Sequence, residues 1–295
     1  MTQVTPIPNT ATIATLNRLR RKRRRLPVLT GIAFGWVGLV VLLVLLAPLL
    51  PLADPAVSDY TSVRTPPFTN WAHPLGTDAL GRDLLSRTIS GAGVSLAVGL
   101  GSTAIAFVVG MAMGTAAGYF GGIWDRIVGW FNDILLAFPT IVALIALTTF
   151  MGPSLSTLIL GMGMVAIPLV SRLARASAMG YVQSDFVSAA KAMGAGSARI
   201  LWREMLPNVT LVVLPFALTM IALAITAEGA LSFLGLGVPP PQASWGGLMN
   251  EGRADLSTLP YIVFVPAMAM CLTLLSISLI ADWFNKRADS REARM

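Results

Sequence analysis

The chain has 295 residues, of which 55% are hydrophobic and only 12% are charged, and its mean hydropathy is +0.73. An average soluble domain is about 25% charged, so this composition excludes a wholly water-exposed surface and predicts one that faces lipid. The single cysteine, Cys271, and the single histidine, His73, exclude a disulfide framework and any metal site that needs two of either residue.

Six apolar stretches are long enough to cross a bilayer, which takes about 20 residues. We expect an all-α membrane protein with spans at 28–50, 94–117, 127–150, 155–171, 210–231 and 261–283. The first stretch is too long for the apolar region of a cleaved signal peptide. Pro139, Pro168 and Pro215 are expected to bend the third, fourth and fifth spans.

Lysine and arginine are distributed unevenly between the two sides of these spans. One side carries 17 of them and the other only four, Arg64, Arg82, Arg87 and Arg253. The positive-inside rule then places both termini in the cytoplasm, so the net charge of +7 reports membrane orientation rather than a nucleic-acid partner. The expected parts are a basic tail at 1–27, a first span at 28–50, an extracytoplasmic segment at 51–93, a five-helix core at 94–284 with a cytoplasmic loop at 172–209, and a tail at 285–295.

The extracytoplasmic segment contains a run of alternating charges. Asp78, Arg82, Asp83 and Arg87 are spaced so that opposite charges three or four residues apart support a short helix. We interpret this run as a structured platform for another protein. The alternative is a solvated loop whose charges pair with one another.

Two acidic residues fall inside predicted spans, where a charge is costly and is a functional candidate by default. Asp133 would line a passage or pair with an arginine of a neighbouring helix. Glu228, near the outer end of the fifth span, would gate a passage or reach water at the membrane surface.

Glycines recur every four residues in the second span, at Gly110, Gly114 and Gly118. Small residues at this spacing let two helices pack backbone to backbone. The neighbouring helix belongs either to this chain or to a partner membrane protein. Cys271 and the methionines of the fourth and sixth spans are expected only to fill space.

The cytoplasmic loop predicts two short helices that meet at a glycine turn. Ser184 or Asp185 can cap the first helix, along which apolar residues recur at helical spacing. These residues are Phe186, Ala189, Ala190 and Met193. Its small side chains would allow close approach by another protein, whereas the alternative is an amphipathic helix that lies on lipid.

Gly194 and Gly196 are expected to end the first helix, and Ser197 can cap the second. The apolar positions of this second helix are Ile200, Leu201 and Met205. We expect it to end at Pro207.

Four motifs resemble those of the dipeptide/oligopeptide/nickel ABC-importer permeases, and specifically their C-type subunit. They are the outer stretch 73–87, the stretch 133–139 (Asp-Ile-Leu-Leu-Ala-Phe-Pro), the cytoplasmic loop, and the stretch 228–246. The loop, with Ala189-Ala190, Gly194 and then Leu206-Pro207, resembles the EAA loop of ABC importers, although Ser188 replaces its glutamate and Glu204 its isoleucine.

The resemblance implies the type I ABC-importer permease fold, in a multi-pass protein of the bacterial inner membrane. It also implies that the loop couples to an ATPase through Phe186, Ala189, Ala190, Gly194, Arg199, Leu206 and Pro207. Asp78, Arg82 and Asp83 would then belong to a docking site for an extracytoplasmic substrate-binding protein, and Asp133 and Glu228 to the passage or its gate.

The implied partners are a homologous sister permease, two ATPase subunits or domains that carry ATP and Mg²⁺, the binding protein, and membrane lipid. The implied substrates are dipeptides or short oligopeptides, with nickel complexes or another small solute as the alternative.

Motifs for chemistry within the chain are missing. None of the three lysines, Lys22, Lys191 and Lys286, follows a glycine, so there is no P-loop for ATP. His-Glu-x-x-His and Gly-x-Ser-x-Gly are also missing, so we expect no enzyme and no cofactor or metal in this chain. The competing functional classes are an ion-coupled secondary transporter, which often shows paired halves, and a membrane scaffold or receptor. Uptake that persists without ATP would favour the former.

Overall fold

The structure is a computed structural model that describes residues 28–292. The predicted basic tail at 1–27 and the last three residues lie outside this range. Within it the chain is helical, and the β-type pairing consists of one isolated bridge between Thr77 and Asp83. The fold class predicted from the sequence is therefore confirmed.

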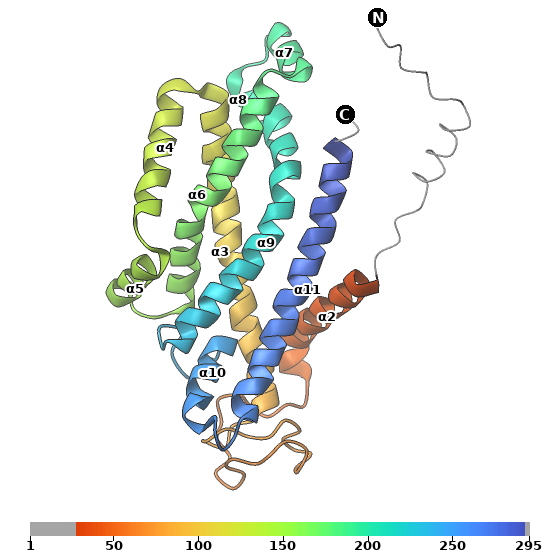
Figure 1. Cartoon of the computed structure of the whole chain (residues 1–295), viewed down its shortest axis with the longest axis vertical. Coiled ribbons are helices and arrows are strands. Elements are labelled where there is room, and N and C mark those ends of the chain that lie inside the picture. Colours follow the sequence, from red (N-terminus) through yellow and green to blue (C-terminus); the bar gives the residue numbers. More distant parts are fainter. Residues whose placement is uncertain (1–27, 293–295) are drawn as a thin grey trace, which may run out of the picture.

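The main helices form one elongated bundle. In chain order they are α2 (Val28–Leu46), α3 (Leu84–Phe120), α4 (Gly122–Ala137), α5 (Thr140–Met151), α6 (Leu155–Val182), α9 (Leu206–Phe233) and α11 (Tyr261–Glu292). Most of them run along the length of the bundle, whereas α2 and α5 are inclined to it (Figure 1). Shorter elements are η1 (Ala47–Leu49), α7 (Asp185–Ala192), α8 (Ser197–Arg199), η2 (Ile200–Met205), α10 (Trp245–Gly252) and η3 (Arg253–Asp255). Among the described residues, five helices are long and apolar enough to cross a membrane.

The predicted third span is not one helix. It is divided into α4 and α5, whose axes differ by 83°. Proline disfavours the helical conformation of the residue before it, and Phe138 is extended (φ −91°, ψ 131°) where Pro139 follows. The sequence predicted a kink at Pro139, and the structure shows a complete break instead. Residues 28–292 contain six spans if the bent pair counts as one.

The main seam of the bundle joins α3 to α6. Gly110, Gly114 and Gly118 lie on this seam, and a Cβ atom added to them would come within 2.7–2.8 Å of side-chain carbons of α6. Gly118, for example, would meet the Cβ of Ala178 at 2.7 Å. The glycines therefore pack against a helix of this chain, which was one of the two alternatives.

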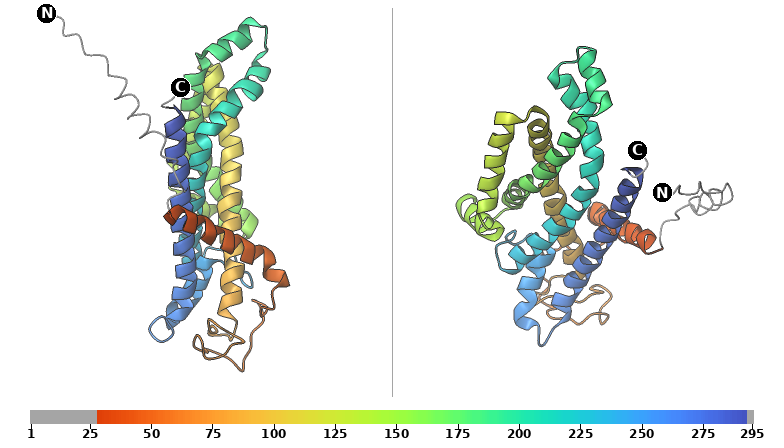
Figure 2. Two further views of the ribbon diagram at one scale, coloured as in Figure 1. Left: turned by 90° about the vertical axis from the view of Figure 1, so that its right-hand side faces the viewer. Right: turned by 45° about the horizontal axis from the view of Figure 1, so that its top comes forward.

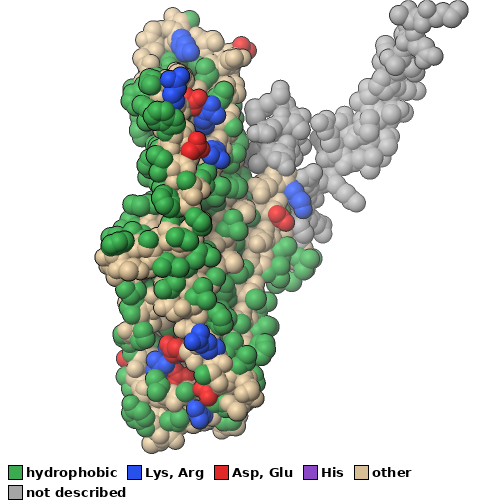
Figure 3. Space-filling model, turned by 60° about the vertical axis from the view of Figure 1, so that its left-hand side comes forward, with side chains coloured by type: hydrophobic (Ala, Val, Ile, Leu, Met, Phe, Trp, Pro, Cys, Tyr) green, Lys and Arg blue, Asp and Glu red, His purple; other side chains and the backbone are tan. Residues whose placement is uncertain are grey.

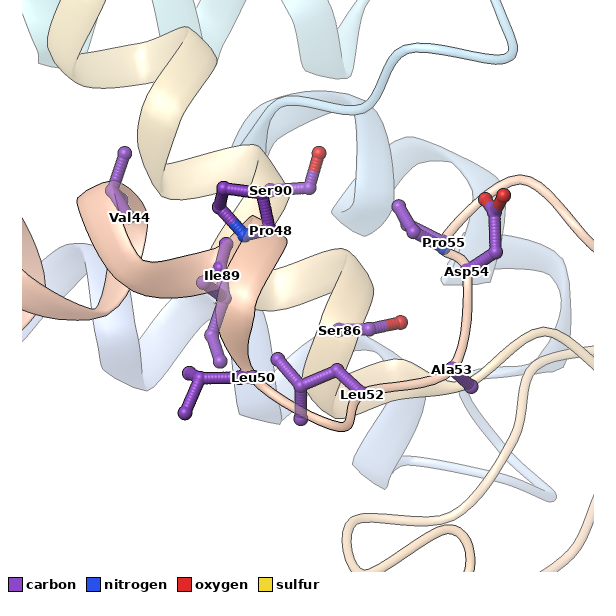
Figure 4. A pocket seen from close by; sticks show the side chains of 11 residues that line it. Val44, Pro48, Leu50, Leu52, Ala53, Asp54, Pro55, Ser86, Ile89 and Ser90 are labelled. Atoms are coloured by element: carbon purple, nitrogen blue, oxygen red, sulfur yellow. The ribbon is translucent and has the colours of Figure 1, made fainter.

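The first helix, α2, lies obliquely across the bundle (Figure 2). It contacts mainly α11, and the indole N–H of Trp36 donates a hydrogen bond to the Thr273 hydroxyl at 3.1 Å. A pocket of about 560 Å³ lies where α2 ends, between residues 47–55 and the first turns of α3 (Figure 4).

Charged side chains gather toward the two ends of the face shown in Figure 3, and a band of mainly hydrophobic and uncharged surface separates them. Such a band is the surface that a hydrocarbon layer about 30 Å thick requires. One end carries α7 and α8, which the charge count assigns to the cytoplasm. The other end carries α10 and the segment between α2 and α3 (Figure 1).

Candidate functional site

The cytoplasmic loop begins with α7, and its end has a defined glycine geometry. Gly194 has a φ of +78°, which glycine adopts without strain. The N–H of Ala195 donates to the carbonyl of Ala190, and the N–H of Gly194 donates to that of Lys191, each at 3.0 Å. This pair of bonds is a Schellman motif. The predicted break at Gly194 is therefore confirmed, and a side chain there would strain the turn.

One side of α7 is fastened to the membrane helices. Val187 and Ala190 are buried in the same apolar cluster as Ile200 and Met205. This cluster continues into α3, α6 and α9. The loop therefore moves with the ends of three long helices rather than as a separate flap.

The other side of α7 is exposed to water. Phe186, Ala189 and Met193 are exposed on it, and Trp202 of η2 is 70% exposed. We call these four residues the coupling surface. The sequence grouped Ala190 with this face, but Ala190 points into the cluster and is only 6% exposed.

Trp202 was missed by the sequence interpretation. The sequence did contain an indication of it, because a large aromatic residue between Leu201 and Arg203 in a water-exposed loop suggests a surface that another molecule covers. Arg199 and Gly194 are exposed beside this surface, whereas Leu206 is partly buried against the cluster.

The expectation that the second short helix ends at Pro207 is wrong. Residues 200–205 form a π-helical turn that leads directly into α9, so that Ser197–Phe233 is a single 37-residue helical stretch. Pro207 directly follows this π-helical turn, whose altered hydrogen bonding accommodates a residue without a backbone N–H. The coupling surface is thus continuous with a membrane span.

At the outer end, the predicted run of charges forms a network. Arg82 and Arg87 both bind the carboxylates of Asp78 and Glu251, with Arg82 Nε 2.7 Å from Asp78 Oδ2 and Arg87 Nη1 2.9 Å from Glu251 Oε2. Arg87 is only 1% exposed. The sequence did not identify Glu251, which comes from α10 and joins that helix to α3 and the outer segment.

Asp78 is held ionised by this network. Burial raises the pKa of Asp78, but backbone N–H groups of Arg82 and Leu80 and the charges of Arg82 and Arg87 lower it below its usual range.

The predicted short helix across residues 78–87 does not form as such. Residues 78–83 are a turn, and α3 begins at Leu84 with Asp83 as its N-cap, whose carboxylate accepts from the N–H of Ser86 at 2.7 Å. Asp78, Arg82 and Asp83 are all buried. Their side chains pair with other charged groups of this chain, as the alternative of a self-paired loop predicted, but they are buried rather than solvated. They are therefore not exposed to a docking partner.

The polar side of α4 faces α6. The Asp133 carboxylate is 2.8 Å from the Arg172 guanidinium. Nearer the cytoplasmic end of α4, Asp125 pairs with Arg175. The arginine partner expected for Asp133 is therefore present. Both members of the Asp133–Arg172 pair remain more than half exposed, so this face is available to water or to a partner chain.

Glu228 does not lie at the membrane surface. It is 0% exposed between α3, α9 and α10, and its two carboxyl oxygens accept hydrogen bonds from Ser95 (2.8 Å) and Ser232 (2.5 Å). The alternative that Glu228 reaches water at the membrane surface is therefore wrong, and a gating role stays a prediction. Close packing of α10, in which the Trp245 N–H groups contact Ser95 and Thr88, covers it.

The described residues thus form a helical membrane bundle with a water-exposed loop at one end and a charge-linked platform at the other. Residues 84–293 match the family described as "Binding-protein-dependent transport system inner membrane component". The chain belongs to this family, and it is a multi-pass inner-membrane permease subunit of an ABC importer.

Related proteins agree with this assignment. The chain is 36% identical over 220 residues to the glutathione transport system permease protein GsiD of Pectobacterium atrosepticum, which covers 75% of this chain and 73% of the relative. It is 34% identical over 233 residues to the protein of the same name in Escherichia coli O6:K15:H31, covering 79% and 76%. The solved structure of the inward-facing MetNI methionine ABC transporter matches 70% of this chain and 96% of its own, with a TM-score of 0.55 and 18% identity, which shows the fold alone.

Proposed function

We propose that this permease forms half of a passage that imports short peptides, in the range from dipeptides to glutathione-sized molecules. Two similarities support this substrate class: the motifs of the peptide and nickel permeases and the glutathione permeases among its relatives. A homologous sister permease would supply the other half of the passage. The exposed Asp133–Arg172 pair is our candidate for a polar patch on that passage.

The proposal includes the source of energy. Two ATPase subunits or domains would bind ATP and Mg²⁺ below the membrane, and this chain would contribute no ATP site. The coupling surface would dock into one of them, and ATP-driven closure of the ATPases would tilt α3, α6 and α9 through the shared cluster.

One observation carries this mechanism. The coupling surface exposes Phe186, Met193 and Trp202 to water, while Val187 and Ala190 on the opposite side of α7 are buried with the membrane helices. Exposed apolar groups on a rigid base are typical of an interface. An amphipathic helix on lipid would instead turn that apolar side toward the membrane.

Ala189→Arg tests the mechanism better than changes at the neighbouring positions. Ala189 is exposed, whereas a side chain at Gly194 would strain the turn and one at Ala190 would disrupt the cluster. An arginine at a desolvated interface opposes docking by burying an unpaired charge. We expect the assembled transporter to lose most ATP-dependent uptake while the variant chain melts at the wild-type temperature.

The control is Ala56→Arg, the same change at an exposed position on the outer side. It should leave ATP-dependent uptake unchanged. Wild-type coupling of hydrolysis to uptake in Ala189→Arg would refute the assigned role of this surface. Uptake of radiolabelled dipeptide, glutathione and a nickel complex, each delivered by the binding protein, would then identify the substrate class.

A further inference from the structure

The outer segment between α2 and α3 exposes large aromatic side chains. Phe68 and Trp71 are 73% and 85% exposed, and Tyr60 earlier in the segment is 80% exposed. The segment extends past the outer ends of α3 and α11 (Figure 1), so a bilayer around those helices does not cover it. Exposed aromatic groups in an aqueous loop mark an interaction site rather than a lipid-facing surface.

The loop that carries Phe68 and Trp71 is closed and ordered. At its base, the N–H of Thr77 donates to the carbonyl of Thr65 at 3.0 Å, and the N–H of Thr65 donates to the Thr77 hydroxyl at 2.9 Å. Further out, the N–H of Phe68 donates to the carbonyl of Pro74 at 3.0 Å. We call residues 66–76 the aromatic loop. Its closure fixes the backbone that carries the two aromatic side chains before any partner arrives, which lowers the entropic cost of binding.

Phe68 also has a strained backbone. Its φ is +63°, in the left-handed region that a bulky aromatic residue rarely adopts. Such strain persists only where the surrounding structure enforces it, and it is concentrated at functional sites. Here the closed loop enforces it, and the ring remains exposed rather than packed beneath the loop.

The aromatic loop is fixed to the membrane helices at its foot. Nδ1 of the buried His73 lies 3.1 Å from Oδ1 of Asp83, the N-cap of α3. Beyond it, Asp78 and Glu251 bind Arg87 of α3 and so attach α10 to the same base. A partner on the loop therefore acts on α3 and α10 without a flexible link between them.

The loop also limits the chemistry of its partner. His73, which is buried, is the only ionisable side chain in residues 66–76. Recognition by this loop therefore uses apolar and aromatic contact and uncharged hydrogen-bonding groups rather than charge. The family is defined by transport that depends on a binding protein, and such a protein reaches the importer from this side.

We propose that Phe68 and Trp71 are the principal docking residues for the extracytoplasmic substrate-binding protein, and that the surface of that protein facing them is apolar and carries few charges. This inference rests on the proposed import function. Asp78, Arg82 and Asp83 then act by holding the loop in place and do not touch the binding protein.

The first experiment places a photo-crosslinking amino acid at Trp71 in the complete transporter in proteoliposomes. We expect an adduct with the binding protein on irradiation. The matched control is Phe264, which is 59% exposed but lies in the membrane helix α11 and should give no such adduct. Adducts from Trp71 only with the sister permease or only with lipid would overturn the proposal.

The second experiment measures the concentration of binding protein that gives half-maximal stimulation of ATP hydrolysis. Trp71→Ala should raise this concentration about tenfold or more, as truncation of a central aromatic residue does, and Phe264→Ala should not. The wild-type value should change little between low and moderate salt, since the loop carries no exposed charge. An unchanged half-maximal concentration in Trp71→Ala would refute the site. Cross-linking from position 71 to the binding protein, combined with a wild-type complex that the binding protein does not stimulate, would count against the import function and leave the docking site standing.

Discussion

Replacing Gly114 by alanine should separate α3 from α6. The new methyl group would lie 2.8 Å from the Cβ of Ala174, 3.0 Å from the backbone N of Arg175, and still closer to the carbonyl oxygen of Ser171. Carbon atoms in contact lie about 3.5–4.0 Å apart, so the helices must separate by about 1 Å. Two of the three neighbours are backbone atoms, which cannot rotate away.

Overpacking of this kind costs about 1–3 kcal/mol. The same substitution at Gly129 of α4 meets no atom within 4 Å, and there the better helix propensity of alanine stabilises the chain by about 0.5–1 kcal/mol. The free energies of unfolding of the two variants should therefore differ by about 1.5–4 kcal/mol, with Gly114→Ala less stable and Gly129→Ala more stable than the wild type, although the chemical change is identical.

The assay is thermal unfolding of the purified transporter in detergent, followed by ATP-driven uptake in proteoliposomes. Gly114→Ala should melt below the wild type and transport poorly, because the disturbed seam lies beside the cluster that holds α7. Gly129→Ala should melt at or above the wild-type temperature. If Gly114→Ala melts no lower than Gly129→Ala, the close approach of α3 and α6 is wrong.

The remaining predictions concern the buried polar groups. Glu251→Gln should destabilise the outer platform by about 1–3 kcal/mol, because the buried Arg87 loses part of its counter-charge. Arg64→Ala, which breaks an exposed ion pair, should cost less than about 1 kcal/mol in the same unfolding assay. Equal effects of the two substitutions would contradict the network. Glu228→Gln should keep near-normal uptake, because the amide oxygen still accepts a hydrogen bond. Glu228→Leu should lower the free energy of unfolding by about 1–3 kcal/mol, because it leaves two buried hydroxyl groups without an acceptor. Loss of uptake in the glutamine variant without loss of stability would support a gating role. The lowered pKa of Asp78 means that its stabilising contribution is present above the ordinary carboxyl pKa and is lost as the pH falls through its lower folded value. The difference in thermal stability between the wild type and Asp78→Asn should therefore be the same at pH 7 and pH 5, and a smaller difference at pH 5 would contradict the assignment.

The spans were predictable because lipid imposes a length and a composition that local sequence records directly. Breaks in the helices were less predictable. Pro139 breaks one span, whereas Pro207 lies within a continuous helical stretch, yet each follows an apolar or helical run. The difference depends on the backbone around each proline: Pro207 directly follows a π-helical turn, whereas the residue before Pro139 is extended. The local sequence does not show where such a π-helical turn forms.

Hydrophobic periodicity also did not predict which side chains of a short helix face the interior. Residues 186–192 of α7 contain apolar side chains on more than one face, so the spacing fits either Phe186 or Val187 as the buried position. Burial against η2 and α6 decides in favour of Val187. Partners distant in the sequence, such as Glu251 for Arg87 and Ser95 for Glu228, depend on tertiary contacts that no local pattern contains.

The π-helical turn at residues 200–205 has a mechanical consequence. Because it continues the loop into α9, residues 197–233 form one arm that is about 55 Å long at 1.5 Å per residue. Trp202 lies near one end of this arm, and Glu228, clamped under α10, lies near the other. Rotation of the arm by about 5° would displace its far end by about 5 Å, roughly the rise of one helical turn. Under the proposed coupling, leverage of this size would convert a small rotation at the cytoplasmic surface into a change of fit beneath α10 at the outer end of the bundle.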